Sequence, residues 1–219
     1  MAKNASYTKG LNRLFNGGID LDTDTLKVVL VDANDYALSV TGATNATPIV
    51  ITSASHGLSN GDQVLVFNVG GNTAANAIHL VANQTTNTFE LTDLSGTNVA
   101  GNGSYTSGGF IIKLSTDEFL SDIPAGGRVA TSSALSSVSC TASGNGAVFD
   151  AADVTFSAVT GDQVEVIVIY KDTGSASTSP LLLAITDATN LPVTPNGGDI
   201  TIAWSNGTSK ILRLNNSNS

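Results

Sequence analysis

The residues of this chain that could do chemistry are few, and a serine motif is the first to consider. Residues 57–61, GLSNG, match the G-x-S-x-G pattern of a nucleophilic serine. That motif needs a strand before the serine and a helix after it. Here Ser59 is followed by a glycine turn and the strand-like run QVLVF. We therefore interpret GLSNG as a polar turn and not as a catalytic motif.

A second candidate is the acidic run DLDTD, which contains Asp20, Asp22 and Asp24. It is similar to the opening of a calcium-binding loop, but an EF-hand has glycine at its sixth position and glutamate at its twelfth. This chain has Thr25 and Val31 there. We interpret the run as a solvated turn ahead of a strand, with an adventitious cation as the alternative.

The histidines and the cysteine give no metal or redox motif. His56 and His79 lie far apart in the sequence with no cysteine nearby, so zinc spacing is absent and structural roles are expected. The single Cys140 excludes an intrachain disulfide, and we expect a small buried residue there, not a reactive thiol. With no acid/base pair, triad or metal cage, the sequence predicts a non-enzymatic protein without metal or cofactor.

Composition narrows the class of protein further. The chain has 219 residues, of which 41% are hydrophobic, 12% charged and 5% aromatic. Low charge with abundant Ser, Thr, Asn and Gly is typical of β proteins with many turns. Because a sugar-cleaving site needs paired carboxylates in a cleft, and sugar platforms are usually aromatic, the few aromatic residues and single Trp204 argue against a carbohydrate-active enzyme.

Charge and hydropathy bear on partners and location. The net charge of −9 disfavours nucleic acid and an anionic membrane surface as partners, because both bind clustered Lys and Arg. There is no apolar run of about 18 residues that could span a bilayer, and the first residues do not have the pattern of a signal peptide. We expect a soluble chain made in a reducing cytoplasm.

The elements that would position these residues are mostly short strands. A helix is predicted over residues 6–18, with Ser6 as its cap, Leu11, Leu14 and Phe15 on one face, and a Gly-Gly stop. A single capped helical turn is predicted within residues 115–124. Strands are predicted within residues 25–32, 47–69, 77–93, 110–114, 125–140, 153–159, 163–170, 180–186, 199–204 and 209–214.

Two details of the strand pattern can be tested against the fold. The letters GDQV occur at residues 61–64 and again at 161–164, which we interpret as one turn solution used in two unrelated modules. In the second copy the strand continues, with Val164, Val166 and Val168 on one face and Glu165, Ile167 and Ile169 on the other. The end of that strand is apolar on both faces and should be covered twice.

The chain divides into a body and an insertion. No Lys or Arg occurs between Lys27 and Lys113, and that window has short strands separated by Asn-Gly and Gly-Gly turns. We predict a discontinuous body of residues 1–40 and 110–219, interrupted by a module at residues 41–109. The predicted fold class is all-β: a β-sandwich or jelly-roll-like body with an inserted small β-barrel and a short N-terminal helix.

The inserted module resembles a known small domain. The carrying motifs are His56-Gly57-Leu58, Gly61-Asp62 and Phe89-Glu90-Leu91. They are similar to the small β-barrel related to the FCCH domain of ubiquitin-activating enzymes, versions of which recur in bacteriophage tail and virion proteins. The resemblance implies a structural or interaction unit without catalytic residues.

The body resembles bacteriophage virion proteins. The resemblance is carried by TLKVVLVD, FLSDIPAGGRVATSSAL, the stretch from DAADVTF to LLLAIT, and LPVTPNGGDITIAW. It implies a head decoration (cement) protein that binds and stabilises the major capsid lattice at the virion surface, made in the host cytoplasm. A homo-oligomer, with a trimer favoured, is expected. The alternative is a tail, neck or fibre component whose inserted module contacts the host.

The locally basic N-terminal stretch is the predicted contact site. It is either an arm that becomes ordered on a capsid or a neighbouring subunit, or an ordinary helix packed on its own body. The candidate capsid or subunit contact residues are Lys3, Tyr7, Lys9, Leu11, Arg13, Leu14 and Phe15.

Overall fold

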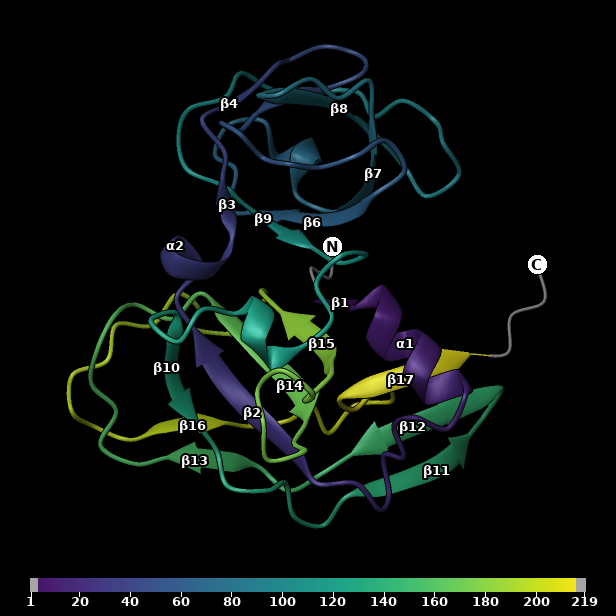
Figure 1. The fold of residues 1–219 in the computed structure, drawn as a ribbon, viewed down its shortest axis with the longest axis vertical. Helices are drawn as coiled ribbons and strands as arrows, with labels where there is room; N and C mark the ends of the chain where they lie inside the picture. Colours follow the sequence, from purple (N-terminus) through teal and green to yellow (C-terminus); the bar gives the residue numbers. More distant parts are fainter. Residues whose placement is uncertain (1–3, 216–219) are drawn as a thin grey trace.

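Strands account for most of the regular structure, as the sequence predicts. The computed structural model describes residues 4–215, which form two lobes, one above the other (Figure 1). We call the larger one the body and the smaller one the upper lobe. Besides the strands, the described residues form helices α1 (Thr8–Phe15) and α2 (Ala33–Tyr36) and the short 3-10 turns η1 (Thr73–Ala75) and η2 (Leu120–Asp122).

The body is organised around a five-stranded antiparallel sheet. Its order is β1 (Asn4–Ser6), β15 (Leu181–Ile185), β14 (Val166–Lys171), β2 (Leu26–Val31) and β10 (Arg128–Thr131). The three central strands are buried along almost their whole length. Strands covered on both faces have continuous apolar runs, so LKVVLV, VIVIY and LLLAI suit this central position.

Two smaller sheets cover one face of the central sheet. They are β11 (Ser139–Ser143), β12 (Gly146–Asp150) and β17 (Leu212–Asn215), and the pair β13 (Val154–Phe156) and β16 (Ile200–Ile202). Phe149 and Phe156 from these sheets share a hydrophobic cluster with Leu30, Ile167 and Ile169 of the central sheet. The body therefore has the layered character of a β-sandwich, and the all-β prediction is confirmed.

The upper lobe is one seven-stranded sheet curled into a half-barrel. Its order is β3 (Leu38–Ser39), β9 (Phe110–Lys113), β6 (Gln63–Phe67), β7 (Ile78–Ala82), β8 (Thr88–Thr92), β5 (Val50–Thr52) and β4 (Gly42–Ala43). Its concave side holds a separate core that includes Ile51, Val64, Phe89 and Leu91. The sheet takes in β3 and β9, whose residues lie just outside the predicted module of residues 41–109.

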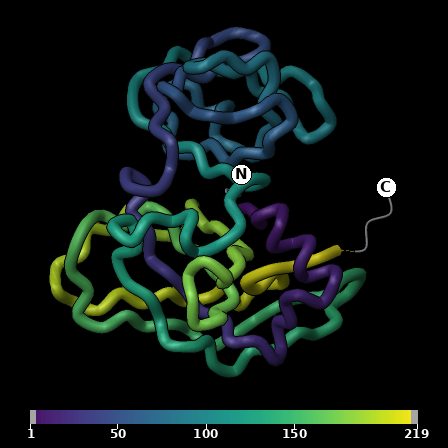
Figure 2. Tube along the Cα trace, viewed as in Figure 1, coloured from purple at the N-terminus to yellow at the C-terminus, as the bar shows by residue number. Residues whose placement is uncertain are grey.

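The two lobes share one hydrophobic core. Alternate residues of β6 and β9 face away from the half-barrel, and Leu65, Phe67 and Ile112 pack with Val31 and Val166 of the central body sheet. Figure 1 shows β6 and β9 at the base of the upper lobe, directly above the body, and Figure 2 shows the chain crossing between the lobes once in each direction. The second face of the central sheet is thus covered by the upper lobe.

Helix α1 ends as predicted but begins differently. Its end has the Schellman pattern, with Gly17 at φ +77° and the Gly18 N–H donating to the carbonyl of Arg13 at 2.7 Å. The prediction of a Ser6 cap is wrong, because Ser6 is the last residue of β1 and pairs with Leu183. The residue before the helix is Tyr7, and its side chain makes no capping bond.

Two strand predictions also need correction. Residues 125–140 do not form one strand. Regular pairing ends with β10, although the Ser132 and Leu135 N–H groups still donate to Val28 and Leu26 of β2, and β11 begins later in another sheet. Strand β14 begins only at Val166, and Val164 makes an isolated bridge to Val193. Val164 therefore lies in the same cluster as Ile167 and Ile169 and not beside Val166.

Candidate functional site

The predicted contact helix α1 packs on its own body. Gly10 is buried, and a Cβ at that position would lie 2.0 Å from the carbonyl oxygen of Leu181 in β15, so the helix backbone contacts the sheet edge directly. Leu14 packs on the body core. The sequence left two alternatives open, an arm that becomes ordered on a partner and a helix packed on its own body. In the described residues α1 is the packed helix.

The seven predicted contact residues divide by exposure. Tyr7 is fully buried, Lys9, Leu11, Arg13 and Leu14 are partly buried, and Phe15 is 75% exposed. Lys3 lies outside the described residues. Burying an apolar side chain of this size against a partner lowers the free energy of the system. Phe15 is therefore the residue of this set whose side chain is available for a contact.

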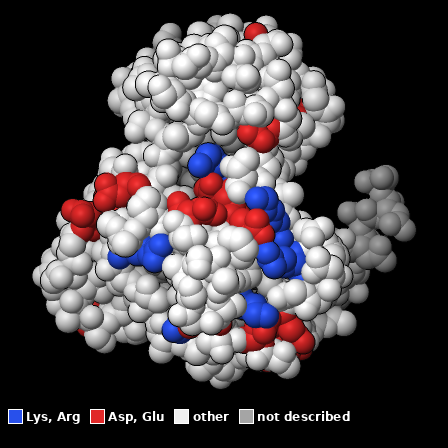
Figure 3. Space-filling view, in the orientation of Figure 1, with Lys and Arg blue, Asp and Glu red and all other residues white. Residues whose placement is uncertain are grey.

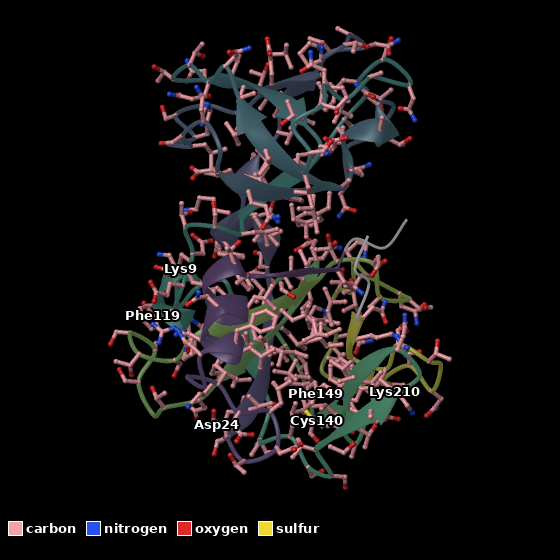
Figure 4. All side chains as sticks on the ribbon, turned by 90° about the vertical axis from the view of Figure 1, so that its right-hand side faces the viewer. Lys9, Asp24, Phe119, Cys140, Phe149 and Lys210 are labelled. Carbon is pink, nitrogen blue, oxygen red and sulfur yellow. The ribbon has the colours of Figure 1, made fainter. Side chains whose placement is uncertain are left out.

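One glutamate, Glu118, pairs with both basic side chains of α1. Lys9 Nζ lies 3.1 Å from one carboxylate oxygen of Glu118, and Arg13 bonds the other oxygen. The Arg13 guanidinium also lies 5.1 Å from the ring centroid of Phe119, and Figure 4 shows Lys9 and Phe119 on the same side of the molecule. Hydrogen bonds from Arg13 and Lys9 lower the pKa of Glu118 below its ordinary value.

A groove in the body lies between the central sheet and the β13–β16 pair. It has a volume of about 670 Å³. Its floor is formed by Leu30, Ile167 and Ile185 of the central sheet, together with Ile202 and Trp204 of the covering layer. The Trp204 Nε1–H donates to the Ala152 carbonyl at 3.0 Å, which fixes the indole in place.

Among the described residues that line the groove, three are charged: Asp187, Asp199 and Lys210, and Lys210 is paired with Asp150 at 3.0 Å. Sequence reasoning missed this site, because its residues come from segments that are distant in the chain and carry no local motif. Only the folded sheet order brings them together.

A group of carboxylates lies near the start of α2, which directly follows β2 of the central sheet. Asp32, Asp35 and Asp162 each offer an oxygen, and these atoms lie within 4.8 Å of one another. Buried Glu165 is next to them and accepts from the Ala33 N–H at 2.9 Å, and its pKa is raised, first by burial and also by the charge of Asp32. Carboxylate oxygens are the ligands that Ca²⁺ prefers, so these residues are the ones whose chemistry would suit a cation.

The motifs rejected at the sequence level have structural surroundings. Ser59 is followed by a turn and β6, and its backbone N–H donates to Asp62 at 2.8 Å. His56 accepts from Leu58 N at 3.0 Å through Nδ1, whereas His79 Nε2 lies 3.0 Å from the Ala75 carbonyl oxygen. Both histidines thus bond the backbone of the upper lobe.

The acidic run and the cysteine lie close together in the body. Asp24 pairs with Lys171 at 2.8 Å, and the residues before it form a turn, as predicted. The expectation of a buried Cys140 is wrong: the residue is exposed on β11, because the edge of that sheet extends past the core. Partial burial and a bond to Asp22 nevertheless raise the pKa of the thiol to about 11, so little reactive thiolate forms at neutral pH.

Comparison with known proteins adds no identity. No helix within residues 4–215 is long and apolar enough to cross a membrane. No model of a protein family matches the sequence, and a search of curated proteins gives no match. The evidence for a functional site is therefore the geometry of the exposed Phe15 of α1 and of the groove.

Proposed function

We propose that this protein is a non-enzymatic structural component of a bacteriophage virion, a decoration or cement protein that binds the major capsid protein on the head surface. The observation that carries the proposal is the core shared by the two lobes. Because Phe67 and Ile112 of the upper lobe share one buried cluster with Val31 and Val166 of the body, we expect the lobes to resist movement relative to each other. A part that reinforces a lattice needs this stiffness.

The surface chemistry supports the same function. The body carries the exposed Phe15 and the groove beside β16, and exposed aromatic side chains and clefts are common at contact surfaces. On the face shown in Figure 3, the outer part of the upper lobe carries only scattered acidic side chains. We therefore place the body against the capsid and the upper lobe outward, in a symmetric oligomer, with a trimer favoured.

The experiment is to locate and count the protein in virions produced by the phage that encodes it. Heads and tails are separated, and the ratio of this chain to the major capsid protein is measured by quantitative mass spectrometry. We expect the chain to remain with heads at a fixed ratio to the capsid protein. Recovery with tails in a few copies would replace this function with a tail, neck or fibre role, and absence from virions would overturn both.

A further inference from the structure

One histidine points into the core of the upper lobe. His79 lies on β7 and is 3% exposed, and its cross-strand partner Val64 belongs to the core that fills the half-barrel. Residues directly opposite each other on antiparallel strands point to the same face of the sheet, so the imidazole points into that core as well. A group that takes up a proton near neutral pH is thereby enclosed among apolar side chains.

The contacts of His79 define its neutral form. Nε2 lies 3.0 Å from the carbonyl oxygen of Ala75 in the η1 turn, and because a carbonyl oxygen can only accept, the proton of the neutral ring is on Nε2. Among residues 4–215, Nδ1 of His79 is the only buried side-chain nitrogen or oxygen without a hydrogen-bond partner. A second proton would therefore bind at Nδ1 and place a positive charge in the core.

The groups beside the imidazole do not offset the cost of that charge. Burial is the largest effect and lowers the pKa of His79, whereas the carbonyl groups of Ala75 and Thr92 and the exposed Asp93 raise it by less. Strand β6 has no charged side chain, and Glu90 of β8 alternates with core residues and so points away from the core. The folded protein therefore favours the neutral ring.

The other elements around this core contribute one ion pair and one more histidine. Lys113 of β9 lies two strands away in the same cross-strand row as His79, and its charge is paired with Asp117 at 3.3 Å. His56 lies against Phe89 of β8, with the ring centroids 5.2 Å apart. No further Lys, Arg or His occurs in residues 28–112, so His79 and His56 are the histidines to be distinguished in a test.

From this geometry we infer that His79 is a pH-sensitive contact, and that its protonation in mild acid opens the connection between β6 and β7, residues 68–77. The η1 turn of this connection lies against the imidazole through Ala75, so the charged ring reaches water only when the turn moves. The inference goes beyond the proposed function, because it concerns the upper lobe alone and does not depend on a place in a virion.

The direction of the pH response follows from linkage. Because the pKa of His79 is lowered in the folded state, its contribution to stability is fully present above the ordinary histidine value of about 6.5. The contribution is lost as pH falls through that value toward the lower folded value. Both histidines belong to the upper lobe, so the body should keep its packing over the same range.

The test measures amide hydrogen exchange of the full chain from about pH 8 to pH 5, the range in which an ordinary histidine titrates. The rates are corrected for the intrinsic effect of pH, so that protection by structure is the quantity compared. We expect the protection of residues 68–77 to fall as pH is lowered, whereas β14 in the body should stay protected. NMR of the imidazole should show His79 titrating below the ordinary histidine value.

Two variants separate His79 from its surroundings. The side chain of His79→Gln can still donate a hydrogen bond to the Ala75 carbonyl but takes up no proton in this range, so the segment should lose its pH-dependent opening. Val81→Ala is the matched control, since Val81 lies on the same strand and in the same core. Its cavity should lower protection by the same factor at every pH. If His79→Gln does not fold, the exchange and the NMR titration of wild type decide the inference.

Three results would overturn the inference. They are a protection of residues 68–77 that does not change with pH, an imidazole of His79 that titrates at or above the ordinary histidine value, and a folded His79→Gln variant whose segment still opens in acid. The last result would assign the opening to His56 or to a carboxylate. The proposed function is tested by the count of chains on heads, so either idea can fail without the other.

Discussion

The upper lobe and the body bury their apolar residues in different ways. The upper lobe curls a single sheet around its own core, and Ile51, Phe89 and Leu91 are sealed inside it. The body distributes its strands over three sheets, and the covering layers leave a groove above Leu30 and Ile167. The upper lobe therefore closes its sheet over one core, whereas the body has a groove between two of its layers.

The difference indicates where a partner would bind. Clefts and exposed aromatic side chains are common at binding sites, and here the groove and Phe15 both belong to the body. Lys and Arg also belong to the body and the junction, since none occurs between Lys27 and Lys113. We expect the body to make the contacts and the upper lobe to be carried by it.

The largest expected effect concerns the core between the lobes. Phe67 is fully buried there, and Phe67→Ala should cost about 3–5 kcal/mol in the free energy of unfolding through lost burial and a cavity. Because the core is shared, both lobes should still unfold in a single transition, measured by calorimetry. Exposed Leu94→Ala, the control, should stay within about 0.5 kcal/mol of wild type. A separate, unchanged melting of the body would show that the cores are independent.

A smaller effect is expected from the polar chain at the same junction. The Tyr36 hydroxyl donates to Asp117 Oδ2 at 2.9 Å and lies 2.8 Å from the buried Tyr7 hydroxyl. Tyr36→Phe leaves both partners without that bond, at an expected cost of about 1–3 kcal/mol in urea unfolding. Tyr105→Phe, in a partly exposed loop of the upper lobe, is the matched control and should cost less. Equal costs for the two variants would contradict this prediction, because they would mean that water reaches the junction as readily as it reaches the surface.

The attachment of α1 to the body can be tested at Gly10. A methyl group there would collide with the Leu181 carbonyl, so Gly10→Ala should move the helix away from β15. An overpacking cost of about 1–3 kcal/mol exceeds the gain in helix propensity of about 1 kcal/mol, and thermal unfolding should therefore shift downward. Asn12→Ala, on the exposed face of α1, should not destabilise. A more stable Gly10→Ala variant would contradict the close contact.

The smallest expected effects are opposite pH responses of two neighbouring acids. Burial raises the pKa of Asp117, so its contribution to stability is fully present below its unfolded pKa and is lost as pH rises through the higher folded value. Hydrogen bonds from Arg13 and Lys9 lower the pKa of Glu118. Its contribution is therefore present above its unfolded pKa and is lost as pH falls through the lower folded value.

Urea unfolding at a series of pH values from acid to neutral would measure both responses. Glu118→Gln should lower the free energy of unfolding at neutral pH by about 0.5–1 kcal/mol, as for other partly exposed ion pairs, and should flatten the loss in acid. Asp117→Asn should remove the pH-dependent contribution of Asp117, so the free energy of unfolding of this variant should fall less as pH rises. Identical pH profiles for wild type and both variants would contradict the two assignments.

Local signals predicted the elements but not their partners. The Gly17-Gly18 stop of α1 and the strands β2, β14 and β15 could be predicted because glycine and continuous apolar runs act locally. Sheet membership could not: the run FIIK lies just beyond residues 41–109, yet as β9 it pairs with β6 of the upper lobe. Strand pairing depends on contacts between distant residues, which a single sequence does not contain.

The repeated letters GDQV show the same limit within one motif. Both glycines have positive φ, +90° at Gly61 and +114° at Gly161, as the turn chemistry predicts. Gln63 begins β6 at once, whereas after Asp162 the chain first makes a bridge from Val164 and only then enters β14. The turn is local, but the start of the strand depends on its neighbours in space.

The residues of the candidate site could also be predicted only in part. The basic, amphipathic N-terminal pattern predicts the exposed Phe15 as a contact residue, but it also places the buried Tyr7 in the same set. Tyr7 is buried because the upper lobe closes over it, a consequence of the shared core. The groove had no local signal at all.

Hydrogen exchange, measured for the free protein and for the protein in its proposed place on the virion, would test the contact assignment most directly. The contact surfaces are assigned to the body, so amides of α1 and of the groove segment 199–204 should exchange more slowly in the bound state. Amides of the turn at residues 83–87, between β7 and β8 of the upper lobe, should exchange as fast as in the free protein. Protection of that turn, with α1 and the groove unchanged, would contradict the account.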